Sequence, residues 1–359
     1  MTQAVQVAAR AALPGTMRAA IFTGPNAPLE LRELAVPTPG PGEILVRVAA
    51  CGLCHTDLHY MDHGVKTFKD PPLVLGHEIS GTVVGAGAGV DAALVGTDVL
   101  LNTVRTCGEC VACRTGRENV CSAQKMLGNN VDGGFAEFVV CAARDAFALP
   151  AELPLLESCI IADALTTAFH AVVRRAAVKP GETVAVFGCG GVGLSVVQVA
   201  SMVGARVIAV DLDAKKLAAA RELGASATVD AHEADVPKLV RREAGGGGAE
   251  VAIEAIGRPV TQEQAVASLR TGARAVLLGS SGVQPMTLNG GRVMYRELTV
   301  MGTLGCRGVD FPVVLDLVRR GKLSVLPLVT HRHPLEDINA GFDQLRRGEG
   351  IRHIAVIGG

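Results

Sequence analysis

The sequence of 359 residues has few aromatic side chains and almost no net charge. Aromatic residues make up 3% of the chain, tryptophan is absent, and the formal net charge is −1. A chain without excess positive charge has no electrostatic basis for binding nucleic acid or an anionic membrane surface. It also has no uninterrupted run of about 18 apolar residues, the length that predicts a transmembrane helix. We therefore expect neither nucleic acid nor membrane as a partner.

The chain is rich in residues that fill packed α/β layers. Hydrophobic residues make up 49%, and there are 43 glycines, which is typical of a large buried core. The length suits two domains. Residues 1–16 lack the pattern of a secretory signal, so we interpret them as an extension. We expect a cytoplasmic protein whose ten cysteines are reduced.

Short strand-like segments, separated by turns that contain Gly or Pro, fill the first part of the chain. They lie at 18–22, 44–48, 82–84 and 138–140. Strands at such spacing predict an all-β, barrel-like domain up to about residue 155.

From about residue 165, apolar runs alternate with helical segments. The runs lie at 183–187, 206–210, 251–253 and 275–278, and the clearest helices at 192–203 and 214–223. This alternation predicts an α/β domain with a doubly wound parallel sheet. After about residue 302 the chain leaves that sheet.

A glycine-rich turn follows the first strand of this second domain. It reads Gly188-Cys189-Gly190-Gly191-Val192-Gly193 and opens a helix without charges. Such glycines permit a tight turn and let the backbone approach a pyrophosphate at the helix N-terminus. Asp211 ends the next strand, near the offset of a carboxylate that accepts the adenosine ribose hydroxyls. Because a carboxylate repels a 2′-phosphate, we expect NAD rather than NADP; the alternative for Asp211 is a turn-forming role.

Four cysteines lie within 15 residues: Cys107, Cys110, Cys113 and Cys121. Four thiolates suit a closed, tetrahedral zinc site that stabilises an irregular loop. An iron–sulfur cluster is the alternative that the thiol count allows. The nucleotide motif and a separate group of mixed ligands favour zinc.

That second group is dispersed along the chain. It comprises the segments Cys54-His55-Thr56-Asp57-Leu58-His59 and Gly76-His77-Glu78, together with Asp163. A catalytic zinc takes about three protein ligands and keeps one position open. The residues alone do not establish that these segments converge.

The order and spacing of all these motifs resemble the zinc-containing medium-chain dehydrogenase/reductase family, the alcohol dehydrogenases. The resemblance covers residues 17–359. It implies a GroES-like β-barrel catalytic domain over 17–164, completed by 302–359, and a Rossmann NAD-binding domain over 165–301. It also implies a homodimer or homotetramer that pairs through the edge of the Rossmann sheet, for which 298–301 is the candidate strand.

Carried over by position, the resemblance implies that Cys54 and His77 bind the catalytic zinc. Glu78 lies beside the metal, and Asp57 orients a ligand. Many family members supply a cysteine as third ligand just before the Rossmann domain. Here Asp163 takes that position, as in some bacterial secondary-alcohol dehydrogenases, with Cys159 four residues earlier. We favour Asp163; the alternatives are Cys159 or Glu78 as ligand, with Asp163 capping the next helix.

The resemblance also assigns the proton path and the phosphate contacts. Thr56 takes the alcohol proton and passes it, through the cofactor ribose, to His59 at the surface. His55 and Arg352 contact the cofactor pyrophosphate.

The expected activity is reversible hydride transfer between a secondary or cyclic alcohol and NAD. Thr103 occupies a position where many relatives carry a bulky aromatic residue, which indicates a wider pocket; the alternative is an ordinary strand residue. The segments 64–67, 76–81 and 128–130 also resemble hydroxy-cyclohexene-carbonyl-CoA dehydrogenases of this family. Hydroxyacyl-CoA and polyol dehydrogenases are the alternatives. In another class, a non-catalytic scaffold that binds NAD and zinc would be expected to lack the proton relay.

Overall fold

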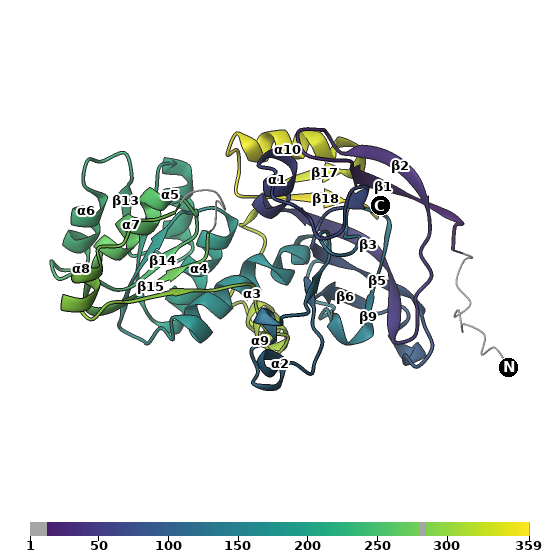
Figure 1. Cartoon of the computed structure of the whole chain (residues 1–359), viewed down its shortest axis with the longest axis horizontal. Helices are drawn as coiled ribbons and strands as arrows, with labels where there is room; N and C mark the ends of the chain where they lie inside the picture. The colour runs from purple at the N-terminus through teal and green to yellow at the C-terminus, as the bar shows by residue number, and fades with distance from the viewer. Residues whose placement is uncertain (1–12, 280–284, 359) are drawn as a thin grey trace. The chain divides into compact units, whose positions relative to one another are not determined.

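The computed structural model describes residues 13–279 and 285–358, and the chain forms two compact units (Figure 1). Unit 1 comprises residues 1–163 and 307–359, and unit 2 comprises residues 164–306. The predicted boundaries lie after residues 164 and 301. Residues 1–12 of the predicted extension lie outside the described residues, and Thr16 at its end already begins strand β1.

Unit 1 is built around a seven-stranded sheet in the order β10-β6-β5-β3-β18-β17, with β9 also paired to β3. Neighbouring strands are antiparallel except β17 and β18. The strands are β3 (Glu43–Leu53), β5 (Glu78–Ala86), β6 (Asp98–Leu101), β9 (Phe138–Ala142), β10 (Ala146–Ala148), β17 (Val329–Pro334) and β18 (Arg352–Val356). Along the central strand β3, only Glu43 and Arg47 are not buried. Its apolar sequence is therefore that of a strand covered on both faces.

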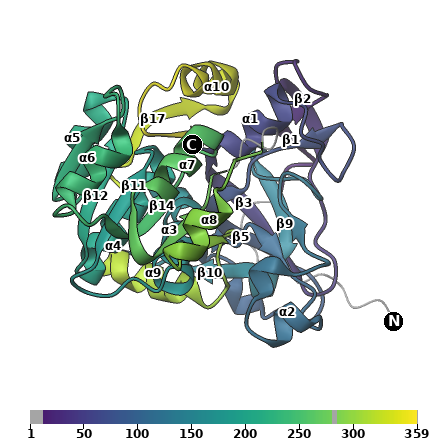
Figure 2. The same cartoon turned by 60° about the vertical axis from the view of Figure 1, so that its left-hand side comes forward.

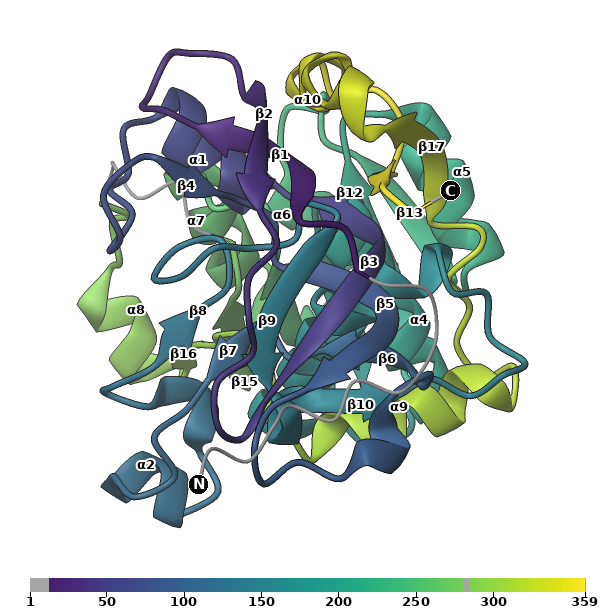
Figure 3. The same ribbon diagram turned by 90° about the vertical axis from the view of Figure 1, so that its right-hand side faces the viewer.

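Smaller elements complete unit 1, and Figure 3 shows them around β9, β3, β5 and β6. A three-stranded sheet contains β2 (Glu30–Ala35), β1 (Thr16–Phe22) and β4 (Leu73–Val74), and a ribbon contains β7 (Val104–Arg105) and β8 (Lys125–Met126). The helices are α1 (His55–Asp62), α2 (Val111–Arg114), α9 (Asp310–Arg319) and α10 (Ile338–Arg346). Short 3₁₀ helices lie at Ala92–Leu94, Glu118–Val120, Ala143–Asp145, Glu157–Ala162 and Leu335–Asp337.

The ends of three strands meet at one place in unit 1. The register pairs Gly52 of β3 with Glu78 of β5, and Leu53 of β3 with His353 of β18. Helix α1 begins directly after β3. Residues far apart in the sequence are thus brought together by strand pairing.

Unit 2 is a six-stranded parallel sheet in the order β13-β12-β11-β14-β15-β16. Its strands are β11 (Thr183–Phe187), β12 (Arg206–Asp211), β13 (Ala227–Asp230), β14 (Ala249–Glu254), β15 (Leu269–Leu277) and β16 (Thr299–Gly302). Its helices are α3 (Ala164–Phe169), which continues into a π-helix at His170–Arg175, α4 (Gly191–Val203), α5 (Ala214–Glu222), α6 (Val236–Glu243), α7 (Pro259–Ala267) and α8 (Gly290–Tyr295). Figure 2 shows α4, α5, α6 and α7 around the sheet.

The strand order of unit 2 reverses between β11 and β14. Numbered within the unit, the order is 3-2-1-4-5-6, in which a ligand binds at the carboxyl ends of the strands where the order reverses. The buried side chains of Ala185, Phe187, Ile208, Val210 and Ala252 form part of the core under the sheet.

None of the helices in the described part of the chain is long and apolar enough to cross a membrane.

Candidate metal centres and nucleotide site

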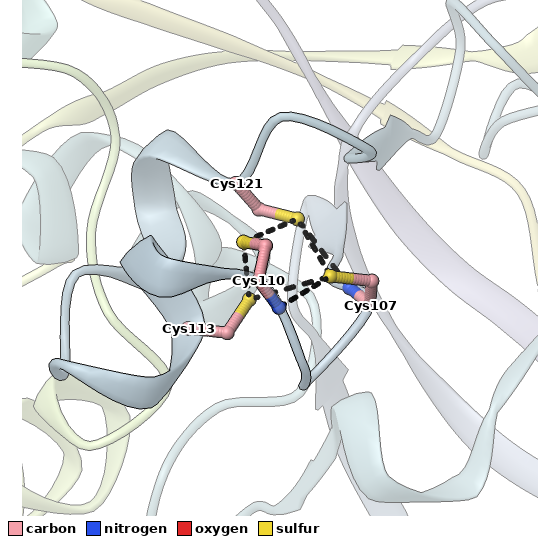
Figure 4. Close-up of side chains that lie close together, drawn as sticks. All are labelled: Cys107, Cys110, Cys113 and Cys121. Carbon is pink, nitrogen blue, oxygen red and sulfur yellow. Dashed lines mark hydrogen bonds between the residues drawn. The ribbon is translucent and has the colours of Figure 1, made fainter.

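The four cysteines of the 107–121 loop converge in the structure (Figure 4). The Sγ of Cys107 lies 3.4 Å from that of Cys121 and 3.8 Å from that of Cys113. The Sγ of Cys110 lies 3.5 Å from that of Cys113 and 3.8 Å from that of Cys121. A disulfide needs sulfur atoms about 2.05 Å apart, whereas thiolates around one zinc at about 2.3 Å lie roughly 3.8 Å from each other. The spacing therefore fits a metal ion.

Backbone amides of the same loop point at these sulfur atoms. Cys110 N donates to Cys107 Sγ at 3.4 Å, and Ala123 N donates to Cys121 Sγ at 3.4 Å. The backbone N–H of Cys113 lowers the pKa of the Cys110 thiol to about 6. Metals bind thiolates rather than thiols, so this amide favours the ligand form of Cys110, whereas burial raises the pKa of the Cys113 thiol to about 12.

A second group of potential ligands lies in unit 1: Cys54, His77, Glu78 and Asp163 each offer an atom within 4.8 Å of the others. The first three are buried, and the Asp163 side chain is 20% exposed. Cys159, the alternative third ligand, is not a member of this group, although it is fully buried. The structure thus brings Asp163, and not Cys159, beside Cys54 and His77.

The sequence around Cys54 makes it the N-cap of α1. Its Sγ accepts from Thr56 N at 3.5 Å, and the Asp57 carboxylate accepts from Cys54 N at 3.1 Å, which completes a capping box. Asp57 also accepts from Gly76 N at 3.3 Å. One buried carboxylate therefore connects the two segments that supply Cys54 and His77.

The imidazole of His77 lies between two carboxylates. Its Nδ1 is 3.6 Å from Asp57 Oδ1, and its Nε2 is 3.8 Å from Asp163 Oδ2. Burial lowers the pKa of His77, but the charge of Asp57 and the polar contacts with the Asp163 and Asp57 carboxylates outweigh burial and raise this pKa well above its ordinary value. The surroundings thus favour positive charge here. A carboxylate facing Nδ1 holds the ring so that Nε2 can bind a metal.

Glu78 is paired with Arg352 behind this group. Both side chains are buried, and Arg352 Nη2 donates to Glu78 Oε2. Burial raises the pKa of Glu78 to about 7 against the opposing charge of Arg352. Glu78 Oε1 is buried and has no hydrogen-bond partner among the residues that the structure describes, a costly state for a carboxylate oxygen unless a cation lies next to it.

Gly52 is the residue opposite Glu78, and no sequence motif points to it. A Cβ at this position would overlap Glu78 Oε2 and lie 3.0 Å from the Glu78 Cβ. The glycine therefore provides the space in which the Glu78 carboxylate lies.

The predicted relay residues lie on α1. Thr56 Oγ1 is 3.6 Å from Cys54 Sγ, His59 is half-buried, and His55 is exposed. The Thr103 hydroxyl donates a hydrogen bond to the backbone oxygen of His77 at 3.1 Å. Thr103 therefore helps to hold the backbone of His77 in place. Contacts of His55 and Arg352 with a pyrophosphate stay predictions.

Three glycines of the 188–193 turn have distinct surroundings in unit 2. Gly188 has φ +92°, which disfavours any residue with a side chain, and a Cβ on Gly193 would overlap the backbone oxygen of Gly188. A Cβ on Gly190 would meet nothing within 4 Å. Gly190 is the N-cap of α4. The turn is thus tight, and the space over the helix N-terminus is open to a phosphate group.

Asp211 lies at the carboxyl end of β12 and contacts this turn. Its Oδ2 accepts from Cys189 N at 2.6 Å, and its Oδ1 accepts from Asp213 N at 2.9 Å. The side chain is half-buried. Asp211 therefore both supports the turn and places a carboxylate beside it.

A GroES-like unit with two groups of metal ligands and a Rossmann unit with a glycine-rich turn define a zinc-dependent dehydrogenase. Residues 40–151 match the alcohol dehydrogenase GroES-like domain, and residues 191–320 match the zinc-binding dehydrogenase family. The chain is 34% identical to an L-threonine 3-dehydrogenase of Bacillus velezensis over 325 residues, which cover 89% of this chain and 92% of the relative. It is 34% identical to an alcohol dehydrogenase of Geobacillus stearothermophilus over 336 residues, 93% and 97% of the two chains. A solved structure of an NAD-dependent alcohol dehydrogenase superposes with a TM-score of 0.89, at 33% identity, over 95% of this chain and 100% of the other.

The chain belongs to the zinc-containing alcohol dehydrogenase family. The predicted fold class is confirmed, and so are the oxidoreductase class and the use of zinc and a nicotinamide cofactor.

Proposed function

We propose that this protein uses NAD to oxidise a secondary alcohol to a ketone, and catalyses the reverse reaction. The observation that carries this proposal is the convergence of Cys54, His77 and Asp163 beside the unpartnered Oε1 of Glu78. A thiolate, an imidazole and a carboxylate suit a zinc ion with one position open for substrate. The cysteines at 107–121 would hold a second, structural zinc.

Zinc at the first site supplies a Lewis acid that lowers the pKa of an alcohol, and NAD supplies the hydride acceptor. Asp57, whose Oδ1 lies 3.6 Å from His77 Nδ1, would orient the ring so that Nε2 is the atom available to a zinc ion. The Thr56 hydroxyl, 3.6 Å from Cys54 Sγ, accepts the proton of the substrate hydroxyl and donates its own onward. His59, half-buried in the last turn of α1, carries the proton toward solvent. Arg352 holds the Glu78 carboxylate in place through their ion pair.

The proposed preference for NAD depends on Asp211. Its carboxylate lies at the carboxyl end of β12, bonded to Cys189 N in the glycine-rich turn. A ribose hydroxyl can donate to this carboxylate, whereas a 2′-phosphate would be repelled at the same place.

L-Threonine is the first substrate to test, because its reacting hydroxyl is secondary and because relatives that cover most of this chain carry the name L-threonine 3-dehydrogenase. Thr103 supports a cyclic or bulky secondary alcohol as a second candidate. Its hydroxyl is bonded to the His77 backbone, and it fills less space than the aromatic residue of many relatives.

The test is a substrate panel on the purified, zinc-loaded protein. L-Threonine, cyclohexanol, 2-butanol, 1-butanol and a hydroxyacyl-CoA are each assayed with NAD and with NADP, and Thr56→Val serves as the variant without the hydroxyl. We expect secondary alcohols to reduce NAD faster than NADP, and Thr56→Val to lower kcat by roughly 100-fold or more. A protein that contains zinc and binds NAD but oxidises none of these alcohols would contradict the proposal.

We also propose that the protein is cytoplasmic and forms a homodimer or homotetramer. Support for assembly comes from β16, which is one of the two edge strands of the unit 2 sheet. Exposed Met294 and Tyr295 lie on α8, shortly before this strand. An edge strand with apolar side chains nearby is a surface that another copy can cover.

A further inference from the structure

A second histidine, His63, lies directly beside the proposed relay residue His59. The two Nδ1 atoms are 3.2 Å apart, and the ring centroids are 5.3 Å apart with a tilt of 50°. On a helix, residues four positions apart face the same side. His59 is in the last turn of α1, and His63 is its C-cap.

The backbone after α1 fixes this arrangement. Gly64 adopts a left-handed conformation with φ +65°, which a residue with a side chain rarely takes. Val65 N then donates to the backbone oxygen of His59 at 3.1 Å. The chain thus folds back over the end of the helix and holds His63 next to His59.

His63 is more exposed to solvent than Thr56 and His59, which precede it in the proposed relay. Thr56 and His59 are half-buried, whereas His63 is exposed. A proton that reaches His59 still has to leave a partly covered site, and His63 is the neighbour that reaches bulk water.

The contact between the two Nδ1 atoms dictates which nitrogens move the proton. One Nδ1 must donate and the other must accept, because two lone pairs or two N–H groups would repel each other. When His59 donates, its Nε2 carries the lone pair that can receive a proton. His63 then accepts at Nδ1 and carries its own proton on Nε2.

The two carboxylates of α1, Asp57 and Asp62, are bonded to groups other than the two histidines. Asp62 of α1 is bonded to Arg346 of α10, with Nε–Oδ2 and Nη2–Oδ1 both 2.8 Å, and Arg346 also pairs with Asp343. Asp57 faces the opposite direction, toward Cys54 N and Gly76 N. Burial and, next, the charge of His63 lower the pKa of His59, so a cation on His59 passes its proton on readily.

We infer that His63 is the last member of the proton relay, and that protons leave the active site through the His59–His63 contact. In the direction of alcohol oxidation, a proton arrives at His59 Nε2, and the proton on His59 Nδ1 moves to His63 Nδ1. His63 releases its Nε2 proton to water or buffer. One proton enters and one leaves, and both rings reset by exchange with solvent. This inference rests on the proposed function, and it extends the relay beyond His59.

The test compares His63→Gln with the wild type in a weakly buffered solution. A pH indicator records proton release during a single turnover, while NADH absorbance records hydride transfer. The matched control is His232→Gln, which removes an exposed histidine of unit 2 that pairs with Asp230. We expect proton release to slow about tenfold or more in His63→Gln, to recover when imidazole buffer is added, and to stay normal in the control.

A double variant and a titration separate a relay from a structural role. If the two histidines act in series, His59→Gln/His63→Gln is no slower than His59→Gln alone. NMR titration is independent of turnover: without the charge of His63, the pKa of His59 should rise. Wild-type proton release in His63→Gln, or a loss that imidazole does not restore, would overturn the inference. A wild type that oxidises no alcohol would instead overturn the proposed function, and the titration would still report on the pair.

Discussion

Replacing Gly52 by alanine introduces one methyl group at the most crowded point behind the candidate catalytic site. An ideal Cβ at residue 52 would overlap Glu78 Oε2 and lie 3.0 Å from the Glu78 Cβ. The backbone cannot easily move away, because Gly52 pairs with Glu78 in the β3–β5 register. The Glu78 carboxylate must then leave its position opposite Arg352, although both side chains are buried.

The size of the effect follows from that buried ion pair. Separating such partners costs about 3–5 kcal/mol, and a domain of this size loses roughly 2–4 °C of Tm per kcal/mol. We therefore expect Gly52→Ala to lower the unfolding transition of unit 1 by roughly 6–20 °C. The variant should also bind the catalytic zinc more weakly, because Glu78 belongs to the ligand group.

Gly85→Ala is the matched control for this experiment. It lies in the same strand pair, opposite Leu45, and a Cβ there would meet only Leu45 atoms, at 3.4 Å and beyond. Calorimetry and zinc analysis of both variants give the result. If Gly52→Ala unfolds within 2 °C of Gly85→Ala and keeps all its zinc, the Glu78–Arg352 pair does not hold the site as described.

Three further predictions concern other parts of the molecule. Asp211→Ala should raise the KM for NAD about 10- to 100-fold, since a hydrogen bond to a charged group contributes roughly 1.5–3 kcal/mol. It should also reduce the preference for NAD over NADP. Equal KM values for NAD in variant and wild type would refute the assigned role. Cys121→Ser should release one zinc per chain and expose the 104–126 segment to limited proteolysis, and a variant that keeps both metals would show that this residue is not a ligand. Burial raises the pKa of Asp145 from 3.8 to about 6. The contribution of this carboxyl group to the free energy of unfolding is therefore fully present below pH 3.8 and is lost as the pH rises through 6. The loss is at most about 3 kcal/mol. Asp145→Asn should therefore gain stability relative to the wild type between pH 4 and 7 in denaturant titrations, and parallel pH profiles would contradict this.

The sequence predicted the features that depend on short segments. The strands at 183–187 and 206–210 and the helix at 192–203 match β11, β12 and α4 to within one residue. The cysteines at 107–121 lie close together in the sequence, so their spacing already indicates one site. Such patterns are local and need no knowledge of how the chain folds.

The dispersed site was harder to predict, because strand register brings it together. The pairing of Gly52 with Glu78, and of β18 with β3, places Arg352 behind the candidate metal ligands, and no local pattern encodes this. The predicted role of Arg352 was a contact with the cofactor pyrophosphate, and this prediction did not include the ion pair of Arg352 with Glu78. The role of Gly52 and the contact of His63 with His59 also became visible only in three dimensions.

The most direct test of the central claim is the zinc content of Asp163→Ala, measured by elemental analysis after dialysis against a weak chelator. Cys159→Ala is the control, because Cys159 is buried nearby but is not a member of the ligand group. We expect two zinc ions per chain in the wild type and in Cys159→Ala, and one in Asp163→Ala, with the four-cysteine site still filled. Two zinc ions in Asp163→Ala, or one in Cys159→Ala, would contradict the site formed by Cys54, His77 and Asp163.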